Sequence, residues 1–294
     1  NIRFKNFKTE INKCVEKEPV IVSDEEPAFW LYSSGSTGEP KGVIHAHGSL
    51  LNTFETYACK VLGIKENDVV FSVAKLFFAY GLGNAMTFPM GVGATTALYP
   101  LRPTPDTVNE VMILVKPSIL FAVPTIYAAM IANLKKNSIK YQNLRRCVSA
   151  GEALPSQIGT DWKNITGVDI LDGVGSTEML HIFLSNKPND ITYGTSGSAV
   201  PGYDLKLVDE YGEEVAIGEI GELLVKGQSS AMCYWNKLTK SRNTFEGKWT
   251  RTGDKYEKIK DQKYIYSGRT DDMFKVSGIW ISPFEVEQAL VSHE

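Results

Sequence analysis

The stretch SILFAVPTIYAAMIANL (118–134) consists of a short apolar run, a Val-Pro dipeptide and a segment with helical periodicity. The apolar run at 118–122 predicts a buried strand, and the pattern at 125–134 predicts a helix. A strand that leads directly into a helix is the repeating unit of parallel sheets. The stretch therefore predicts an α/β fold with a mainly parallel sheet flanked by helices.

The same alternation extends to both sides of this unit. Further buried strands are predicted at residues 69–73, 94–99 and 145–150. Further helices are predicted at residues 49–62, 104–115 and 155–165. Residues 1–193 are accordingly expected to form one α/β part.

From about Gly194 onward the pattern changes to short strands separated by tight turns. Strands are predicted at residues 204–208, 219–226, 248–252 and 263–267, with a turn at 209–212. Tight turns between neighbouring strands favour antiparallel pairing. We expect a small antiparallel β subdomain over residues 194–268, followed by a hinge and the truncated start of another domain over residues 269–294.

Composition excludes several classes of protein. The 294 residues carry 31 basic and 34 acidic side chains, so the net charge of −3 argues against a nucleic-acid partner. The longest weakly polar stretch, 85–99, is broken by proline and glycine and is too short to cross a membrane. The four cysteines lie far apart without a CxxC pair, which argues against a disulfide framework or zinc site. A reducing cytoplasm is therefore the expected location.

The most unusual segment is YSSGSTGEPKGVIHAH (32–47), which is rich in glycine and hydroxyl side chains. Exposed backbone N–H groups, hydroxyls and the charge of Lys41 suit a polyphosphate. The segment is not a Walker A loop, because Lys41 stands between Pro40 and Gly42. A flexible linker is the alternative. The aromatic run before the segment and the apolar VIHAH at its end favour a phosphate loop.

The second segment, ILDGVGSTEMLH (170–181), is an apolar strand that leads through two glycines into Ser176, Thr177 and Glu178. A hydroxyl and a carboxylate beside a phosphate loop suit Mg²⁺, which keeps most of its waters. The alternative is an ordinary strand-to-helix turn, with Ser176 or Thr177 as the N-cap. The segment alone does not decide between the two interpretations.

The third segment begins with WTRTGDKYEK (249–258), where Asp254 is expected on a turn after Gly253. A carboxylate there suits the two hydroxyls of a ribose, and Arg269 is placed to reach the same sugar or a phosphate. A turn aspartate and a surface arginine are the alternative. The glycines and acids around Asp271 suit a hinge.

Together and in this order, the segments resemble motifs of the adenylate-forming superfamily of acyl-CoA synthetases, peptide-synthetase adenylation domains and luciferases. The resemblance extends from Phe29 to Glu287. SSGSTGEPKG (33–42) resembles the phosphate loop of that family, GVGSTE (173–178) its magnesium motif, and TGD (252–254) its ribose-binding turn. GRTDDMFKVSG (268–278) resembles the hinge and the start of the mobile C-terminal domain.

The resemblance implies a role for each matching residue. Ser33, Thr37 and Lys41 would handle the ATP phosphates, and Thr177 would contact the α-phosphate. Glu178 would hold Mg²⁺. The full ATP and AMP site implied in this way comprises Ser33, Ser34, Gly35, Ser36, Thr37, Gly38, Lys41, Gly151, Glu152, Ala153, Asp172, Gly173, Thr177, Asp254 and Arg269.

Three further implications concern the base, the sugar and the hinge. Asp172 would meet the adenine amino group, Asp254 the ribose hydroxyls, and Asp271 would be the pivot of the hinge. Val174 departs from the family pattern, because many members place an aromatic side chain there to stack on the base.

AKLFFAYGLGN (74–84) and STEMLHIFLSN (176–186) are similar to segments of benzoate-CoA ligases and their aryl-CoA relatives. In that group the first stretch walls the carboxylate pocket, here implied to comprise Ala79, Tyr80, Gly81, Val174 and His181. No acidic residue occurs in 74–84, and a buried substrate ammonium without a partner would be costly. An aromatic acid is therefore favoured over an amino acid. For Phe77 in particular, core packing is the alternative.

The resemblance implies an ATP-dependent ligase that makes an acyl-adenylate from a small aromatic carboxylic acid and then its coenzyme A thioester. Thr177, Glu178 and His181 would be catalytic, with ATP, Mg²⁺ and coenzyme A as co-substrates. A module that loads a carrier protein and a non-catalytic nucleotide-binding fragment are the alternatives. The family's N-terminal portion and adenylation lysine fall outside these residues, so we expect weak or no activity from them alone. The oligomeric state is open, with a homodimer as one option.

Overall fold

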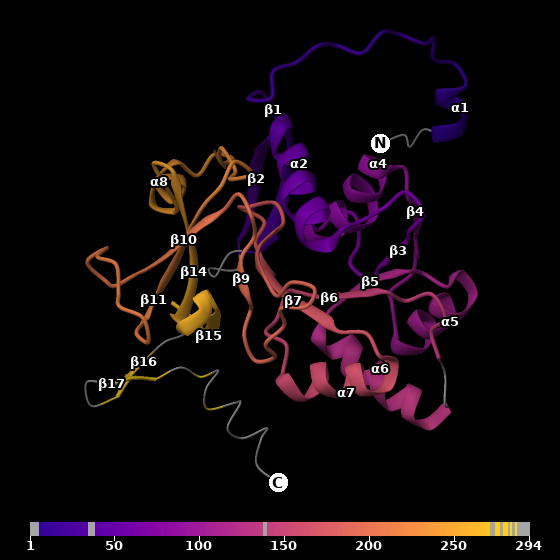
Figure 1. The fold of residues 1–294 in the computed structure, drawn as a ribbon. Helices are drawn as coiled ribbons and strands as arrows, with labels where there is room; N and C mark the ends of the chain where they lie inside the picture. Colours follow the sequence, from indigo (N-terminus) through magenta and orange to yellow (C-terminus); the bar gives the residue numbers. More distant parts are fainter. Residues whose placement is uncertain are drawn as a thin grey trace.

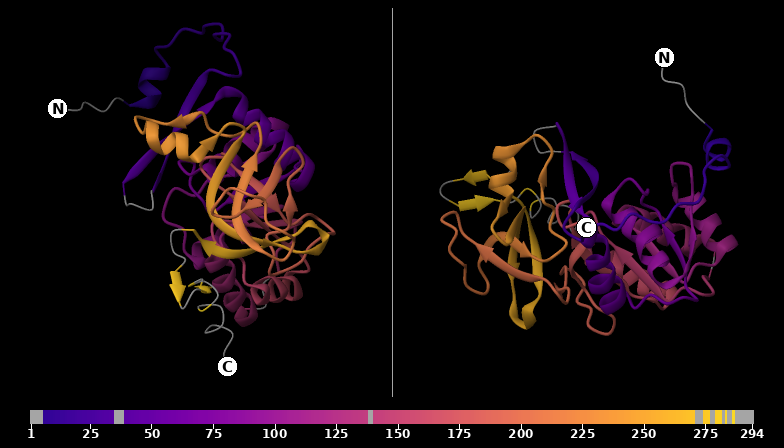
Figure 2. Two further views of the ribbon diagram at one scale, coloured as in Figure 1. Left: turned by 90° about the vertical axis from the view of Figure 1, so that its left-hand side faces the viewer. Right: turned by 90° about the horizontal axis from the view of Figure 1, so that it is seen from above.

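The computed structural model describes residues 6–34, 39–137, 140–270, 274–276, 279–281, 283 and 286. An α/β part and an antiparallel β part lie side by side (Figure 1). Figure 2 shows the same two parts from two further directions, with the antiparallel strands gathered on one side of the molecule. Among the described residues, no helix combines the length and the apolar character that crossing a membrane requires.

The α/β part is built on a seven-stranded sheet with the order β4-β3-β5-β6-β7-β8-β9. The strands from β4 to β7 pair in parallel, whereas β8 and β9 pair antiparallel. The bounds are Val69–Ser72 for β3, Thr95–Ala97 for β4, Ile119–Ala122 for β5, Arg146–Ser149 for β6, Ile170–Gly175 for β7, Ile182–Ser185 for β8 and Ser198–Ala199 for β9. The mainly parallel sheet predicted from the sequence is confirmed.

Helices cover both faces of this sheet, with α2 and α4 above it and α5, α6 and α7 below it in Figure 1. The strand β5 shows why its apolar run is continuous. Ile119 and Phe121 pack in one cluster with Tyr57, while Leu120 and Ala122 pack in the other, because successive side chains of a strand point to opposite faces.

The helices have the following bounds. They are Phe7–Ile11 for α1, His47–Thr53 for α2 with its π-helical continuation Phe54–Leu62, Ala79–Leu82 for α3 with its π-helical continuation Gly83–Thr87, Phe88–Val92 for α4, Pro105–Val115 for α5, Pro124–Asn137 for α6 and Ser156–Thr166 for α7. Thr104 caps α5, where its side chain accepts a hydrogen bond from the backbone N–H of Thr107. The four predicted helices are therefore present, with ends shifted by a few residues.

The antiparallel part is a five-stranded sheet in which β10, β11, β14 and β13 are consecutive and β15 also pairs with β14. Its elements are β10 (Asp204–Val208), β11 (Ile220–Lys226), α8 (Leu238–Thr244), β13 (Phe245–Glu246), β14 (Trp249–Lys258), a 3₁₀ turn (Lys260–Gln262) and β15 (Tyr264–Arg269). A separate pair follows, β16 (Phe274–Val276) and β17 (Ile279–Ile281). The predicted antiparallel β subdomain is confirmed.

A third sheet connects the two parts through β1 (Pro27–Ser34), β2 (Pro40–Ala46) and β12 (Cys233–Tyr234). Tyr234 pairs with Val43 and Cys233 pairs with Ile44, although about 190 positions separate them. The predicted boundary after residue 193 is therefore crossed by paired strands. The division into 1–193, 194–268 and 269–294 stays a prediction.

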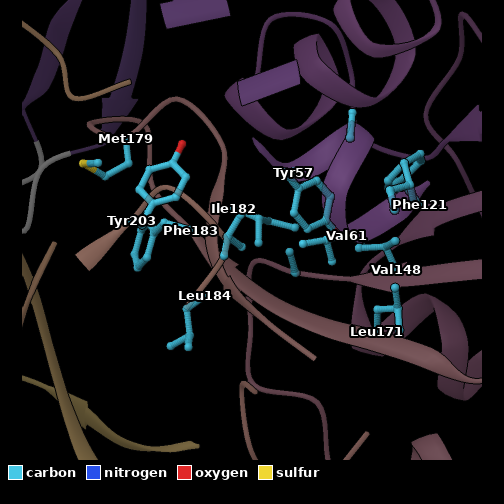
Figure 3. Close-up of a cluster of buried hydrophobic side chains, with 14 of the residues drawn as sticks. Tyr57, Val61, Phe121, Val148, Leu171, Met179, Ile182, Phe183, Leu184 and Tyr203 are labelled. Atoms are coloured by element: carbon cyan, nitrogen blue, oxygen red, sulfur yellow. The ribbon is translucent and has the colours of Figure 1, made fainter. Parts of the chain in front are cut away.

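The larger hydrophobic cluster also runs across the two parts (Figure 3). It joins Tyr57, Phe121 and Val148 of the α/β part to Tyr203 and Tyr256 of the antiparallel part. All five side chains are at most 5% exposed. This shared core fixes the edge of the parallel sheet relative to the antiparallel strands. The predicted motifs lie where these two parts meet.

Candidate active site

Strand β2, which carries Lys41 and His45, meets the Thr177–Glu178 turn in the structure. Lys41, on β2, places its Nζ 2.7 Å from Oε1 of Glu178, and both side chains are largely buried. His45, on the same strand, places its Nε2 2.7 Å from the carbonyl oxygen of Thr177. Two segments separated by 137 positions therefore share one site.

The turn that carries Glu178 is a reversal between antiparallel strands. The predicted alternative of a strand-to-helix turn is wrong, because β7 passes through residues 176–181 directly into β8. Ser176 accepts a hydrogen bond from the N–H of Met179 and so stabilises this turn. A Cβ atom at Gly175 would lie 2.5 Å from the carbonyl oxygen of His181, so only glycine permits the close approach of the two strands.

Tyr234 completes the group around Glu178, although it lies in none of the three sequence motifs. Its hydroxyl donates to Oε1 of Glu178 at 2.7 Å and accepts from Nζ of Lys41 at 3.1 Å. The Lys41 ammonium also lies 4.7 Å from the centre of the Tyr234 ring. The available signal was the apolar and aromatic run MCYW (232–235), which indicates a buried strand but not a hydroxyl aimed at a carboxylate.

These contacts keep Glu178 ionised. Burial alone would raise the pKa of Glu178, but the charge and hydrogen bond of Lys41 and the hydrogen bond from Tyr234 outweigh it, so the pKa is lowered. The N–H of Ala231 donates to the main-chain carbonyl of Glu178 at 2.7 Å and fixes the backbone of the turn. The site therefore presents a fixed, negatively charged oxygen.

Asp254 and Arg269 lie opposite each other on β14 and β15. The prediction that Asp254 sits on a turn is wrong, since it lies inside β14 at an irregularity where Gly253 has a φ of +74°. Nη1 of Arg269 donates to Oδ1 of Asp254 at 2.9 Å. Burial raises the pKa of Asp254 to about 6 despite Arg269, and Glu178 adds to the rise. Asp254 of the third segment and Glu178 of the second therefore lie close enough for their charges to interact.

The residues predicted around the adenine divide between two pockets. Asp172, on β7, and Ala153 line one pocket, while Gly151 lines another that also contains Thr177. Oδ1 of Asp172 has no hydrogen-bond partner among the described residues, and burial raises the pKa of this carboxyl well above its usual range. Glu152 is exposed, and Gly173 packs its backbone against Ile182.

The second pocket has a volume of about 480 Å³ and is lined mainly by apolar side chains. Ala79, Tyr80 and His181 of the predicted acyl pocket line it, together with Thr177. The hydroxyl of Tyr80 donates to main-chain carbonyls of β5 and β6, so the pocket receives the ring of this side chain. The described lining contains no carboxylate.

Two residues predicted for this pocket do not line it. Gly81 packs against the backbone of Lys75, where a Cβ atom would lie 2.0 Å from the carbonyl oxygen. Val174 is partly buried against the larger hydrophobic cluster. Phe77 is 67% exposed, so the alternative that it packs in the core is wrong. Its neighbour Phe78 does line the pocket.

His181 is a buried, neutral histidine. Its Nε2 lies 3.0 Å from Oδ1 of Asn84, and its ring centre lies 4.5 Å from that of Phe88. Burial lowers the pKa of His181 to about 3. The ring can therefore shape the pocket and exchange hydrogen bonds, but it carries no charge near neutral pH.

Comparison with known proteins places this geometry in a family. Residues 3–235 match the model of the AMP-binding enzyme family. The chain belongs to this family. It is 58% identical to a 4-hydroxybenzoate–CoA/benzoate–CoA ligase from Rhodopseudomonas palustris over 94% of this chain and 51% of that protein.

Two solved structures resemble this member of the AMP-binding family closely. A benzoate CoA ligase from Burkholderia xenovorans LB400 superposes with a TM-score of 0.91 at 48% identity, over 98% of this chain and 57% of that one. An anthranilate CoA ligase in complex with anthranoyl-AMP gives a TM-score of 0.89 at 45% identity, over 95% and 54%. The chain therefore spans about half the length of the relatives it matches.

The side chains of this AMP-binding family member fit a magnesium nucleotide. Oγ of Ser33 is buried and has no hydrogen-bond partner among the described residues, as suits a group that meets an anion. Within the same residues, no three His, Cys, Asp or Glu side chains gather as a metal site. A cation at Glu178 would therefore take its other ligands from phosphate oxygens and water, which is the usual arrangement for Mg²⁺.

Six predicted residues lie at or beyond the edges of the described segments. Ser34 is described only as the end of β1, opposite Pro40. The remainder lie outside the described residues, namely Gly35, Ser36, Thr37, Gly38 and Asp271.

Proposed function

We propose that this chain is the adenylating part of an ATP-dependent acid–thiol ligase for a small aromatic carboxylic acid. The carboxylate would react with ATP to give an acyl-adenylate and pyrophosphate, and coenzyme A would then give the aryl-CoA thioester and AMP. The observation that carries this proposal is the contact between Lys41 and Glu178 at 2.7 Å, beside the apolar pocket lined by Thr177. The likeness to benzoate-type ligases supports the same reaction.

In the first step, a carboxylate oxygen of the acid forms a bond to the α-phosphorus, and the bond from that phosphorus to pyrophosphate breaks. Ser33 and Lys41 would bind phosphate oxygens, and the Thr177 hydroxyl would contact the α-phosphate. Donors already positioned where negative charge develops stabilise such a transition state. Glu178 would hold Mg²⁺, which when bound offsets charge on the phosphate oxygens.

In the second step, the thiol sulfur of coenzyme A gives up its proton to water and attacks the acyl carbon, and the bond between that carbon and the AMP oxygen breaks. The adenylate supplies the leaving group, so no protein nucleophile is needed. His181, neutral in its buried position, would orient the acyl group. Asp254 and Arg269 would hold the ribose, and Asp172 would accept from the adenine amino group.

The pocket favours an uncharged aromatic ring. Ala79, Phe78 and the ring of Tyr80 provide flat apolar surface. A substrate ammonium would find no carboxylate in the described lining, and burying it unpaired would cost several kcal/mol. The anthranilate ligase held with anthranoyl-AMP is consistent with an aryl-adenylate at this place in the fold. We place the reaction in the cytoplasm, with a homodimer as one possible assembly.

Calorimetry on this chain tests the proposal with three probes: ATP with Mg²⁺, benzoate, and benzoyl-AMP. The adenylate should bind at least about 100-fold more tightly than benzoate, because it occupies both the nucleotide site and the acyl pocket. A chain that bound neither ATP nor benzoyl-AMP would contradict the proposal. Thioester formation on a carrier protein, but not on free coenzyme A, would show that a carrier protein is the acceptor of the acyl group. The proposed adenylation step would still hold.

A further inference from the structure

We propose that Tyr234 is a positioning residue that holds the carboxylate of Glu178 in place while its cationic partner changes from Lys41 to magnesium. The inference rests on the proposed function, in which Lys41 binds phosphate and Glu178 holds the metal. It assigns a task to a residue of β12, which lies in none of the three motifs.

The hydroxyl of Tyr234 is directed at the same atom as the lysine. It donates to Oε1 of Glu178 at 2.7 Å, and Nζ of Lys41 lies 2.7 Å from that oxygen. A magnesium ion bound to this oxygen and the lysine ammonium would repel each other at such a distance. The ammonium must therefore leave when the metal arrives, whereas the neutral hydroxyl can stay.

The two partners differ in freedom of movement. Lys41 has a flexible four-carbon stem that ends in a point charge. Tyr234 is 3% exposed and packs its ring against Phe245, at 5.3 Å between ring centres. Its backbone N–H donates to Oγ of Ser241 at 2.9 Å. The hydroxyl is therefore fixed by β12 and α8, and Lys41 is the partner suited to move to the phosphates.

Without the hydroxyl, Glu178 would lose a fixed donor at the moment when Lys41 turns away. The carboxylate would then sample several rotamers, and the metal would have to order it. Outer partners of metal ligands typically change metal affinity by 10- to 100-fold. We therefore expect the loss of this hydroxyl to weaken magnesium binding, so that about 10-fold more magnesium is needed for nucleotide binding.

A similar trio elsewhere in the chain supplies a matched control. The hydroxyl of Tyr193 donates to Oδ1 of Asp169 at 3.0 Å, and Lys163 pairs with the other oxygen of that carboxylate. This trio lies just before the start of β7, whereas Glu178 follows the end of that strand. Tyr193→Phe therefore makes the same chemical change away from the site.

The experiment compares the unsubstituted chain with Tyr234→Phe and Tyr193→Phe by calorimetry. AMP affinity is measured in a chelator, and ATP affinity is measured across a magnesium titration. Tyr234→Phe should raise the magnesium concentration for half-maximal ATP binding by about 10-fold and leave metal-free AMP affinity unchanged. Tyr193→Phe should change neither quantity.

An unchanged magnesium requirement in Tyr234→Phe overturns the inference and leaves the proposed function standing. An equal loss of metal-free AMP affinity also overturns it, because a purely structural role would weaken both. If the unsubstituted chain binds neither nucleotide, the proposed function and the inference fail together. Thermal unfolding of each variant shows that it is folded.

Ser241→Ala is the second variant, to be used in the same titration if Tyr234→Phe does not fold. It keeps the Tyr234 hydroxyl and the Glu178 carboxylate but removes the oxygen that accepts from the Tyr234 backbone N–H, so Tyr234 is held less firmly. A raised magnesium requirement with unchanged metal-free AMP affinity supports the inference. A magnesium requirement equal to that of the unsubstituted chain overturns it.

Discussion

Two buried carboxylates lie near opposite ends of the parallel strands and are paired in different ways. Asp68 stands just before β3 and accepts hydrogen bonds on both oxygens, from Arg145, Ser118 and the backbone of Lys65. Glu178 stands just after β7, and its bonds from Lys41 and Tyr234 both reach Oε1. Both carboxyl groups have lowered pKa values.

The difference between the two pairs lies in their cations. The planar arginine fork holds Asp68 through Nε at 2.7 Å and through Nη2, and Nη2 also donates to the carbonyl of Gly63 at 2.9 Å. This arrangement fixes three loops to one another. Lysine instead contributes a single movable charge. Ligands of α/β sheets bind at the carboxyl ends of strands. The Lys41–Glu178 pair, whose lysine can move, therefore lies where a ligand would bind. The fixed Arg145–Asp68 pair lies at the other end of the strands.

Arg145→Met tests the fixed pair and should have the largest effect on stability. Removing the cation leaves Asp68 buried without its charge partner, which should lower the free energy of unfolding by about 3 kcal/mol. Because the pKa of Asp68 is lowered in the fold, this contribution is complete above the ordinary aspartate value and is lost as pH falls through the folded one. Denaturant unfolding at pH 7 and at pH 3 measures both statements.

Lys65→Met is the control for that variant, because it removes a nearby charge and keeps the backbone N–H that bonds Asp68. It should change stability by less than about 0.5 kcal/mol. Nucleotide affinity of folded Arg145→Met should equal that of the unsubstituted chain. A large loss of affinity without a loss of stability would erase the distinction between the two pairs.

Glu178→Gln should instead lower the reaction rate strongly and the stability only slightly. In the full-length enzyme, magnesium-dependent adenylate formation should fall by on the order of 100-fold, because the amide does not supply a negative oxygen to the metal. Stability should change by only about 1 kcal/mol, since the flexible stem of Lys41 can carry its ammonium to solvent. Adenylate release from benzoate and ATP gives the rate, and denaturant unfolding gives the stability. An unchanged metal-dependent rate would remove Glu178 from the metal.

Asp254→Asn examines a carboxylate whose pKa is shifted in the other direction. Burial raises the pKa of Asp254 to about 6, so between the ordinary value and 6 the folded state binds more protons than the unfolded one, and stability rises as pH falls. The amide removes this cost and should stabilise the chain at pH 7 by about 1 to 2 kcal/mol. It should also weaken ATP binding, because a ribose diol prefers an ionised acceptor.

The pH dependence of the unsubstituted chain sharpens this prediction. ATP affinity should weaken as pH falls through about 6, where Asp254 gains a proton. In Asp254→Asn the same titration should be flat over that range. Affinity equal to that of the unsubstituted chain at pH 7 would show that the ribose binds elsewhere.

The sequence predicted the parallel sheet from local patterns, whereas the meeting of the first two motifs was implied by the resemblance to the adenylate-forming superfamily. Apolar runs and helical periods identify βα units, and parallel pairing then brings the loops after strands to one edge. Glu178, just after β7, follows from this logic, whereas Lys41 lies on β2 of the antiparallel third sheet and does not. The roles of these residues in binding and catalysis stay predictions.

The parts that the sequence did not reveal depend on contacts between distant segments. Tyr234 reaches Glu178 because β12 pairs with β2, and no local pattern near 234 encodes that pairing. Gly253 indicated a turn, but its positive φ is absorbed as an irregularity within β14, which continues to Lys258. The reversal from β7 into β8 was likewise hidden, because Ser176 and Thr177 are as good at capping helices as at forming turns.

Lys226→Ala should have the smallest effect, and it tests whether burial distinguishes the first two pairs. Lys226 and Asp204 stand directly opposite on β11 and β10, 2.7 Å apart at their charged atoms, but their side chains are 42% and 65% exposed. Water and salt screen such a pair, so the loss should be below about 0.5 kcal/mol and should vanish in 1 M salt. Denaturant unfolding at low and high salt measures it. A loss as large as that of Arg145→Met would mean that charge pairing alone, rather than burial and a fixed geometry, sets the stability at both ends of the sheet.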